Sequence, residues 1–362
     1  MIVSVLRRYR DFKWLYDELC RTSGGVIVPA IPDKQIIGNL SAGMYHHHHH
    51  YHHYHHYHHY HHYHHHHHYK AFVESRRRAL EKFLSRCAAH PDLRKSEYFL
   101  SFLREDDDSF NRTKATVKAA KGNVATAAKS WFENAVNTFQ NSGKSEVDAS
   151  PTDSKVDEIQ ANINSLERLI QSIHKGSESL VKRSRELSTA LFDFGQSITW
   201  LGQSEGNDFG SVITKIGTAT SDMSVTATAN AETEAIELEE PLDEYVRLMN
   251  SVKNAIKHRQ NKKESYREAL TDLEVKQAAY NKLRVTGKTD QLDSKRVQVE
   301  ASQANVEKVK KEFEEISDKF LIEYNNFMET TAVEIKQILY NYAKLQAEYN
   351  RKLEKAWGDL LK

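Results

Sequence analysis

The sequence is poor in cysteine, in chain-breaking residues and in long apolar runs. Only Cys20 and Cys87 occur in 362 residues, both beside apolar residues on predicted helices. We interpret them as reduced core thiols of a cytosolic protein, which excludes a disulfide framework. Five prolines and 14 glycines favour long helices with narrow apolar seams. No stretch approaches the roughly 18 apolar residues of a membrane span, and Met1 to Arg10 lack a signal-peptide core. Any membrane contact should therefore be peripheral.

Charge and motif content exclude further classes of function. Lys and Arg number 51 against 50 Asp and Glu, a formal net charge of +1, so no global field indicates a nucleic-acid partner. The sequence has no glycine-rich phosphate loop, no recognisable nucleophile and base motif and, outside one His-rich tract, no Cys/His metal spacing. We therefore predict a non-enzymatic protein without a cofactor or a metal. Its length suits two domains.

Residues 1–104 are predicted to form the first domain from short elements. In chain order, the pattern first predicts a strand over Ile2–Tyr9, a helix over Asp11–Cys20 that stops at Gly24-Gly25, and an extended surface segment at Pro29–Pro32. A helix over Phe72–Ala89 that stops before Pro91 and a short helix over Ser96–Leu103 follow. The helix over Asp11–Cys20 should bury one apolar face made by Phe12, Leu15, Tyr16 and Leu19.

A low-complexity tract interrupts this domain at residues 41–69. From Met44 to Tyr69 it is almost purely His and Tyr, with a tyrosine at every third position from 51 to 63. A period of three matches neither a helix nor a strand, so we interpret the tract as a disordered expansion or an artefact that buries no core. Metal capture and a pH-sensitive basic loop are the alternatives, because imidazole titrates near pH 6.5 and is a common ligand. Identical neighbours in such a loop offer no unique geometry for a catalytic metal.

Residues 105–153 are predicted to be a linker that contains an amphipathic helix. Lysines flank one side of this segment, and apolar residues can share the other, a pattern typical of a helix at a membrane interface. The alternative is a helix that packs on its own protein, since Gly122 and many alanines weaken the apolar face. The apolar positions that would meet lipid are Val117, Val124, Trp131, Phe132 and Phe139.

Residues 154–362 are predicted to form three long helices. The first keeps apolar residues three and four apart from Val156 through Ile173, Leu187 and Phe194 to Leu201, a rhythm that few chance sequences hold so long. The second follows Pro241, with a kink there if it begins earlier, and the third runs from about Gln291 to Lys362. Helices of this length reach roughly 75 to 105 Å, and one chain cannot cover their apolar surface. Dimerisation is therefore expected.

Two groups of basic residues on these helices predict a membrane-facing surface. Anionic lipid attracts such groups by about 1 kcal/mol per basic residue near the surface, although ordinary solvated helix surface is the alternative for any one residue. Arg259 and Lys263 fall on the extrapolated seam, so we expect the register to open there and turn their charges outward. The first group is Lys253, Lys257, Arg259, Lys262, Lys263 and Arg267, and the second, around the Gly287 turn, is Lys282, Arg284, Lys288, Lys295 and Arg296.

Basic residues in the first domain predict a site for a phosphorylated inositol. They lie in Arg7-Arg8-Tyr9, in the proline-rich segment that ends at Lys34, and in Arg76-Arg77-Arg78. Guanidinium groups pair bidentately with phosphate, an ammonium can hold a second phosphate, and an aromatic ring can pack beneath the inositol. The order of these pieces resembles the PX domain, here without its first strands. The resemblance implies that Arg8 binds the 3-phosphate, Tyr9 stacks under the ring, Lys34 meets the 1-phosphate and Arg76 bonds the far hydroxyls.

The helical part resembles a BAR domain, through Trp131-Phe132, Leu191–Gly195 and Pro241–Tyr245. Together the two parts resemble the PX-BAR sorting nexins, in particular those of the fungal retromer coat. The expected fold is thus mainly α, a truncated α+β PX domain followed by a dimerising three-helix BAR domain. The resemblance implies binding of phosphatidylinositol 3-phosphate and anionic membrane, a homodimer or a heterodimer with a second sorting nexin, the retromer core trimer as partner, and the cytosolic face of endosomes as location. Tubule formation and recycling to the Golgi would follow. A coiled-coil scaffold whose first domain docks proteins is the alternative, and a metal-binding or metal-dependent enzyme is the third hypothesis.

Overall fold

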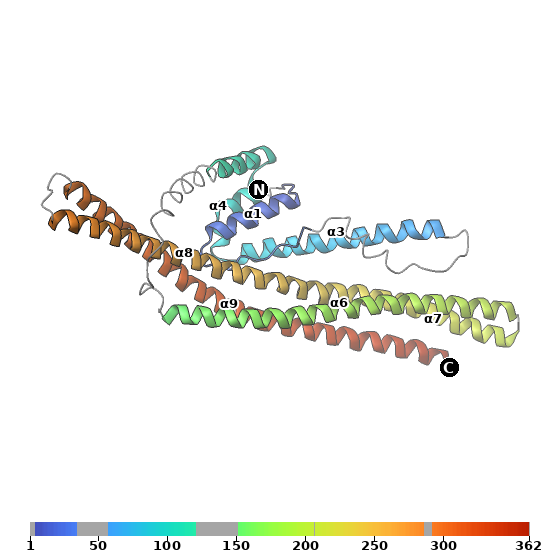
Figure 1. Ribbon diagram of the computed structural model, residues 1–362. Coiled ribbons are helices and arrows are strands. Elements are labelled where there is room, and N and C mark those ends of the chain that lie inside the picture. The colour runs from blue at the N-terminus through green and yellow to red at the C-terminus, as the bar shows by residue number, and fades with distance from the viewer. Residues whose placement is uncertain (1–3, 35–56, 121–150, 206, 286–291, 362) are drawn as a thin grey trace. The chain divides into compact units, whose positions relative to one another are not determined.

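The computed structural model describes residues 4–34, 57–120, 151–205, 207–285 and 292–361. In these ranges the regular structure is helical and contains no strand (Figure 1). Contacts divide the described residues into two compact units, and each is treated by itself below. The first unit takes residues from 1–31, 80–163 and 250–326, and the second takes them from 32–79, 164–249 and 327–362.

Short helices build one core in the first unit. Helix α1 (Tyr9–Thr22), the end of α3 (Tyr57–Ala89), the 3-10 turn η2 (Leu93–Lys95), α4 (Glu97–Arg104) and a helix over residues 107–120 contribute to it. The predicted apolar face of α1 is confirmed, since Leu15 and Leu19 are fully buried and Phe12 and Tyr16 pack beside them. The core side chains are Leu15, Leu19, Val26, Val28, Ile31, Phe83, Cys87, Leu93, Phe99, Phe102 and Phe110.

The glycine pair after α1 ends the helix as expected and lies close to another helix. Gly25 has φ +79°, a left-handed conformation that glycine adopts at little cost. A Cβ built on Gly25 would also lie 2.7 Å from the backbone oxygen of Ile316, so the turn packs directly against the third long helix of the chain. Both requirements exclude other residues at this position.

Two expectations for this domain are wrong. Residues 4–8 form no strand, and Tyr9 begins α1. A strand needs a neighbour with which to exchange backbone hydrogen bonds, and the described residues supply none. Residues 29–32 form no helix, but they are not a surface segment, because Pro29 and Ile31 are buried.

Helix α3 begins earlier than predicted and includes part of the His/Tyr tract. Its end at Ala89, before Pro91, is as expected, but residues 57–69 are helical as well. Nucleation is the costly step of helix formation, and turns added to an existing helix cost at most about 0.7 kcal/mol per ordinary residue relative to alanine. The amphipathic second half of α3 can therefore extend into a tract that lacks a helical period. Residues 41–56 of the tract lie outside the described residues.

The three predicted long helices are present. The first is α6 (Pro151–Glu205), and the third is α9 (Leu292–Leu360). The second begins before Pro241, as α7 (Asp208–Glu234), the π-helical turn η4 (Ala235–Glu239) and α8 (Glu240–Val285). In a regular α-helix the ring of Pro241 would clash with the carbonyl four residues earlier, and a wider π turn relieves that clash. The helix thus continues through the proline.

In the second unit, α6 and α7 approach closely through small residues. A Cβ built on Gly195 would lie 2.7 Å from the carbonyl oxygen of Gly217, and one on Gly202 would lie 2.6 Å from that of Gly210. Both glycines of each helix are seven residues apart, so they share one face. Ser188, one heptad before Gly195, continues this face with a 2.6 Å hydrogen bond to Thr228. Only small side chains permit this backbone separation.

Candidate lipid-binding and dimerisation surfaces

The first half of the predicted phosphoinositide site lies at the N-terminus of α1. Arg8 is the N-cap residue, has extended backbone (φ −88°, ψ 159°) and exposes its side chain, while Tyr9 is half-buried against the core. The positive end of a helix dipole favours an anion at this place. Arg8 can therefore meet a phosphate without losing a contact to the core.

Asp11 holds the backbone of Arg8 in place. Its carboxylate accepts a 3.0 Å hydrogen bond from the Arg8 N–H and a 2.6 Å hydrogen bond from Lys114, on the helix over residues 107–120. Burial alone would raise the pKa of Asp11, but the hydrogen bonds from Lys114 and from the backbone outweigh it and hold that pKa below its ordinary value of 3.8. Asp11 is thus a charged acceptor under physiological conditions.

Arg7, beside Arg8, is a structural residue. Its side chain is 4% exposed, and its guanidinium donates to the carbonyl of Phe102 at 2.9 Å and lies 4.3 Å from the ring centre of Phe110. Sequence reasoning treated the two arginines as one basic group. In extended backbone, neighbouring side chains point to opposite sides, and that rule could have separated them.

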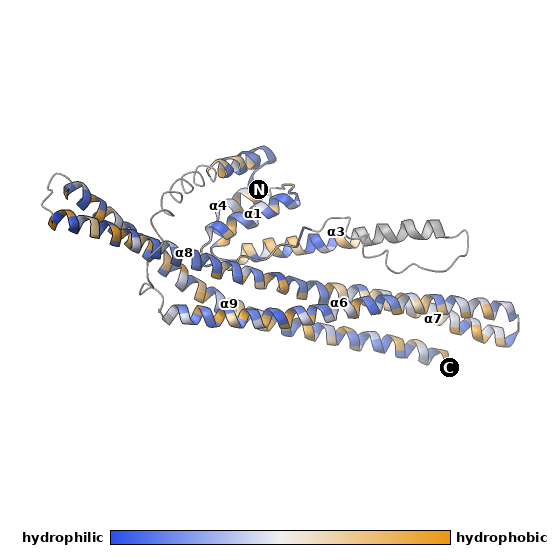
Figure 2. Cartoon of the chain, in the orientation of Figure 1, coloured by the Kyte–Doolittle hydropathy of each residue, from blue (hydrophilic) through white to orange (hydrophobic). Residues whose placement is uncertain are grey.

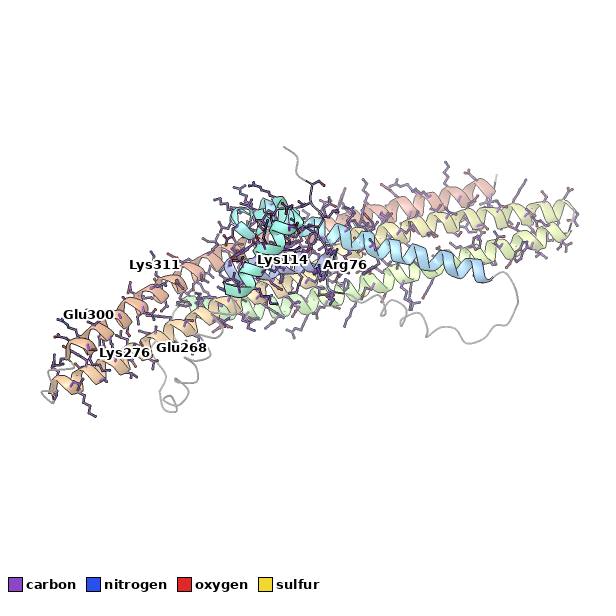
Figure 3. The ribbon with its side chains drawn as sticks, turned by 90° about the horizontal axis from the view of Figure 1, so that it is seen from above. Arg76, Lys114, Glu268, Lys276, Glu300 and Lys311 are labelled. Carbon is purple, nitrogen blue, oxygen red and sulfur yellow. The ribbon has the colours of Figure 1, made fainter. Side chains whose placement is uncertain are left out.

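The second half of the predicted site lies in the second unit. Arg76, on α3, donates a 3.0 Å hydrogen bond from Nη2 to the carbonyl of Asp33, and its guanidinium lies 5.6 Å from the ring centre of Phe72. Lys34 follows Asp33 and is exposed. The structure thus brings the proline-rich segment and the arginine helix together, and Figure 3 labels Arg76 on that helix. The assignment of Arg8, Tyr9, Lys34 and Arg76 to one headgroup site remains a prediction.

Helix α3 also contacts α8 within the second unit. Arg78 pairs with both carboxylate oxygens of Glu240, at 3.0 Å from Nε and 2.6 Å from Nη2. Bidentate pairing fixes orientation as well as distance. The ion pair joins the helix that carries Arg76 to the start of a long helix.

The prediction that Arg259 lies on the surface is wrong. The residue is 2% exposed, donates a 2.8 Å hydrogen bond to Asp153 and a 2.9 Å hydrogen bond to Ser317, and packs against the ring of Phe313. Lys263 also pairs with Asp153, at 3.0 Å, and its side chain is only 14% exposed. The seam does not open here, because a carboxylate at the start of α6 compensates the two charges inside it.

The other predicted membrane-surface residues differ from one another in exposure and in ion pairing. Lys257 is exposed, as are Lys282, Arg284 and Arg296, while Lys253, Arg267 and Lys295 are half-buried. Lys262 pairs with Glu312 at 2.8 Å and Arg267 with Glu264 at 3.2 Å, and Arg296 lies 3.5 Å from Asp293. Lys288 lies outside the described residues. Of the amphipathic positions, Val117 is half-buried on the helix over residues 107–120, and Val124, Trp131, Phe132 and Phe139 lie outside the described residues.

The second unit exposes an apolar row along α6. Leu180, Leu187, Phe194 and Leu201 follow one another at intervals of seven residues and are 46%, 50%, 57% and 52% exposed. Ile173, one interval earlier, is 46% exposed. Apolar residues recur along α9 too, where Val333 and Tyr340 are exposed (Figure 2). A heptad row of large apolar residues is the pattern of a helix seam that needs a partner.

Three observations concern the cysteines, metal binding and membrane spans. Both cysteines are free, and burial raises the pKa of Cys20 to about 11, so this thiol is unreactive at neutral pH. No group of three or more His, Cys, Asp or Glu side chains that could hold a metal occurs in the described ranges. Over the same ranges, no helix is long and apolar enough to cross a membrane.

Comparison with known families accounts for both parts of the chain. Residues 128–362, more than half of the sequence, match the family described as Vps5 C terminal like, and residues 2–106 match the PX domain. The chain belongs to the Vps5 C-terminal-like family. Together with the PX match, this makes it a PX-BAR sorting nexin, and members of these families are non-enzymatic membrane-binding proteins.

Curated relatives and a solved structure agree with this assignment. Sorting nexin 1 of Arabidopsis thaliana is 27% identical over 99% of this chain and 82% of its own length. Sorting nexin-1 of Mus musculus and sorting nexin-2 of Homo sapiens are 22% and 24% identical over 99% of this chain, which spans 64% of their lengths. The cryo-EM structure of the SNX-BAR Mvp1 tetramer has the same fold, with a TM-score of 0.67 at 16% identity, covering 99% of this chain and 90% of that one.

Membership of this family gives the general function of this sorting nexin. Sorting nexins are peripheral membrane proteins, PX domains bind phosphoinositides, and BAR domains dimerise and follow or impose membrane curvature. The described surfaces fit these roles, with an exposed arginine at the start of α1 and an exposed apolar row on α6.

Proposed function

We propose that this sorting nexin binds phosphatidylinositol 3-phosphate on the cytosolic face of endosomal membranes and curves them into tubules as part of the retromer coat. Cargo recycling to the Golgi is the outcome. The observation that carries the proposal is the exposed Arg8 at the N-terminus of α1, beside the half-buried ring of Tyr9. A phosphate on the inositol ring would meet the guanidinium and the helix dipole together, while the ring packs on the tyrosine.

The proposed partners are a second copy of the chain or a second PX-BAR sorting nexin, and the retromer core trimer. Leu180, Leu187, Phe194 and Leu201 support the dimer, because burial of their exposed area stabilises association by roughly 25 cal/mol per Å². The PX resemblance assigns Arg76 and Lys34 to the headgroup as well, and Lys257, Lys282 and Arg284 are the exposed basic residues proposed to face anionic lipid.

Liposome sedimentation tests the headgroup site. Arg8→Ala and Arg76→Ala should each weaken binding to vesicles that contain phosphatidylinositol 3-phosphate by roughly tenfold, since each removes a charge-assisted contact worth about 1.5–3 kcal/mol. Binding to vesicles with unphosphorylated phosphatidylinositol should not change. Arg10→Ala and Arg77→Ala are the matched controls, because both arginines are exposed neighbours on the same two helices.

The same vesicles distinguish a membrane remodeller from a scaffold. Electron microscopy should show tubules with the wild-type protein and few with a Lys257→Glu, Arg284→Glu double variant, while circular dichroism shows unchanged helix content. Lipid binding that survives both headgroup substitutions would reject the site. Headgroup binding without tubules from the wild-type protein would favour the scaffold.

A further inference from the structure

Arg8 is held from two sides by residues that are not among the proposed headgroup ligands. On the C-terminal side, the carboxylate of Asp11 accepts hydrogen bonds from the Arg8 N–H at 3.0 Å and from Lys114 Nζ at 2.6 Å. Asp11 is 7% exposed, and the side chain of Lys114 is 22% exposed, so water screens this pair weakly. Figure 3 labels Lys114 on the helix over residues 107–120.

On the N-terminal side, Arg7 fixes the preceding residue. Its guanidinium donates to the carbonyl oxygens of Phe102 and Glu105, pairs with Asp107 at 3.0 Å, and lies over the ring of Phe110 at 4.3 Å. These groups lie at the end of α4, in the connection that follows, and at the start of the helix over residues 107–120. The backbone on both sides of Arg8 is therefore attached to that helix.

A fixed backbone matters for binding, because a flexible arginine loses conformational freedom when it closes on a phosphate. Preorganisation removes part of this cost and so raises affinity without a new ligand contact. Lys114 additionally contacts the ring of Phe110, with Nζ 4.5 Å from the ring centre, which limits how far it can move from Asp11. Lys118, the exposed lysine of this helix, lies one turn later.

We propose that Lys114, through Asp11, is a positioning residue for the Arg8 phosphate contact, and that headgroup binding and docking of the helix over residues 107–120 strengthen each other. The inference rests on the proposed phosphoinositide binding. Coupling between two equilibria is reciprocal, so a ligand that favours the fixed Arg8 also favours the docked helix by the same factor. The start of the linker between the two family matches thus belongs to the lipid-binding unit.

Calorimetric titration of the full chain with water-soluble, short-chain phosphatidylinositol 3-phosphate tests the coupling without a membrane surface. Lys114→Met keeps the aliphatic stem but removes the charge. It should raise the dissociation constant about tenfold at unchanged stoichiometry. Lys114→Arg should restore most of the affinity, because an arginine can still donate to Asp11. Lys118→Met is the matched control and should bind as the wild type does.

A second measurement follows the helix itself. Spin labels at Thr116 and Lys13, both exposed positions, report the distance between the helix over residues 107–120 and α1. Headgroup addition should narrow this distance distribution in the wild type and have less effect in Lys114→Met.

The outcomes separate this inference from the function on which it rests. If Arg8→Ala weakens headgroup binding while Lys114→Met binds as the wild type does, the coupling is wrong and the proposed function stands. If Arg8→Ala binds normally, the proposed function fails first. A reduced stoichiometry with an unchanged dissociation constant, or an equal loss in Lys118→Met, would show a general folding defect and overturn the positioning role.

Discussion

At the scale of single residues, neighbouring basic side chains have opposite roles. Arg7 is buried among backbone carbonyls and aromatic rings, and Arg8 is exposed. Lys257 is exposed, and Arg259, two residues later, is 2% exposed and paired with Asp153. Burial alone would raise the pKa of Asp153, but the hydrogen bonds from Arg259 and Lys263 lower it below 3.8, so the carboxylate stays ionised. Charge density along the chain therefore does not measure charge at the surface.

The pair Lys257 and Arg259 allows a direct test of this difference. Arg259→Ala should lower the free energy of unfolding by about 3 kcal/mol, because it leaves a buried carboxylate with one cation instead of two. Lys257→Ala should leave stability unchanged and weaken binding to anionic vesicles up to about fivefold, the equivalent of about 1 kcal/mol. Denaturant titration and vesicle sedimentation measure the two effects. A stable Arg259→Ala with weakened vesicle binding would place Arg259 on the membrane surface after all.

At the scale of elements, small residues determine how α6 meets α7. The glycines at 195 and 202 face those at 217 and 210, and the large apolar residues of α6 lie on another side of the helix. Two helices can approach closely only where no side chain separates their backbones. The small residues at seven-residue spacing thus lie in the contact between α6 and α7. The large apolar residues at the same spacing, from Leu180 to Leu201, stay exposed.

Gly217→Ala tests this close approach. The new Cβ would lie 2.6 Å from the backbone nitrogen of Thr199 and 2.7 Å from the carbonyl of Gly195, so the helices must separate, at a cost of about 1–3 kcal/mol. Gly176→Ala is the matched control, because a Cβ there meets nothing within 4 Å and alanine favours the helix by up to about 1 kcal/mol. Thermal melts followed by circular dichroism should therefore shift in opposite directions. A Gly217→Ala protein as stable as the wild type would contradict the packing.

At the scale of the whole molecule, the apolar row on α6 makes the single chain incomplete. Leu180, Leu187, Phe194 and Leu201 are each about half exposed. Such a row is too regular for scattered surface residues, and BAR domains dimerise. We therefore expect membrane curvature by this sorting nexin to depend on assembly as well as on the proposed lipid contacts of each chain.

Leu187→Glu should dissociate the dimer. A carboxylate in the seam must either be buried without a partner or prevent the contact, and both cost several kcal/mol. The expected result is a monomeric mass by light scattering with nearly unchanged helix content, and a loss of tubules in electron micrographs. Lys182→Glu places a carboxylate on a charged part of the same helix and should remain dimeric. A Leu187→Glu protein that stays a dimer would assign this row to another partner.

The sequence alone determined the long helices and the apolar periods along them. The spacing of Leu15 and Leu19 placed one face of α1 in a core, the pair Gly24-Gly25 ended that helix, and the long apolar rhythm predicted α6 and α9. These features are local, because helix formation and termination depend on residues within a few turns. The basic pattern of the PX resemblance likewise located Arg8 and Arg76.

Only the tertiary structure decided which residues meet. Arg259 is buried against Asp153, 106 residues earlier. Asp11, which accepts a hydrogen bond from the Arg8 N–H, also accepts one from Lys114, 103 residues away. The division of the α6 heptads into a buried small face and an exposed large one depends on α7. These outcomes are set by the energy of compensating a buried charge or excluding a side chain at a contact, and that energy exists only once distant segments have come together.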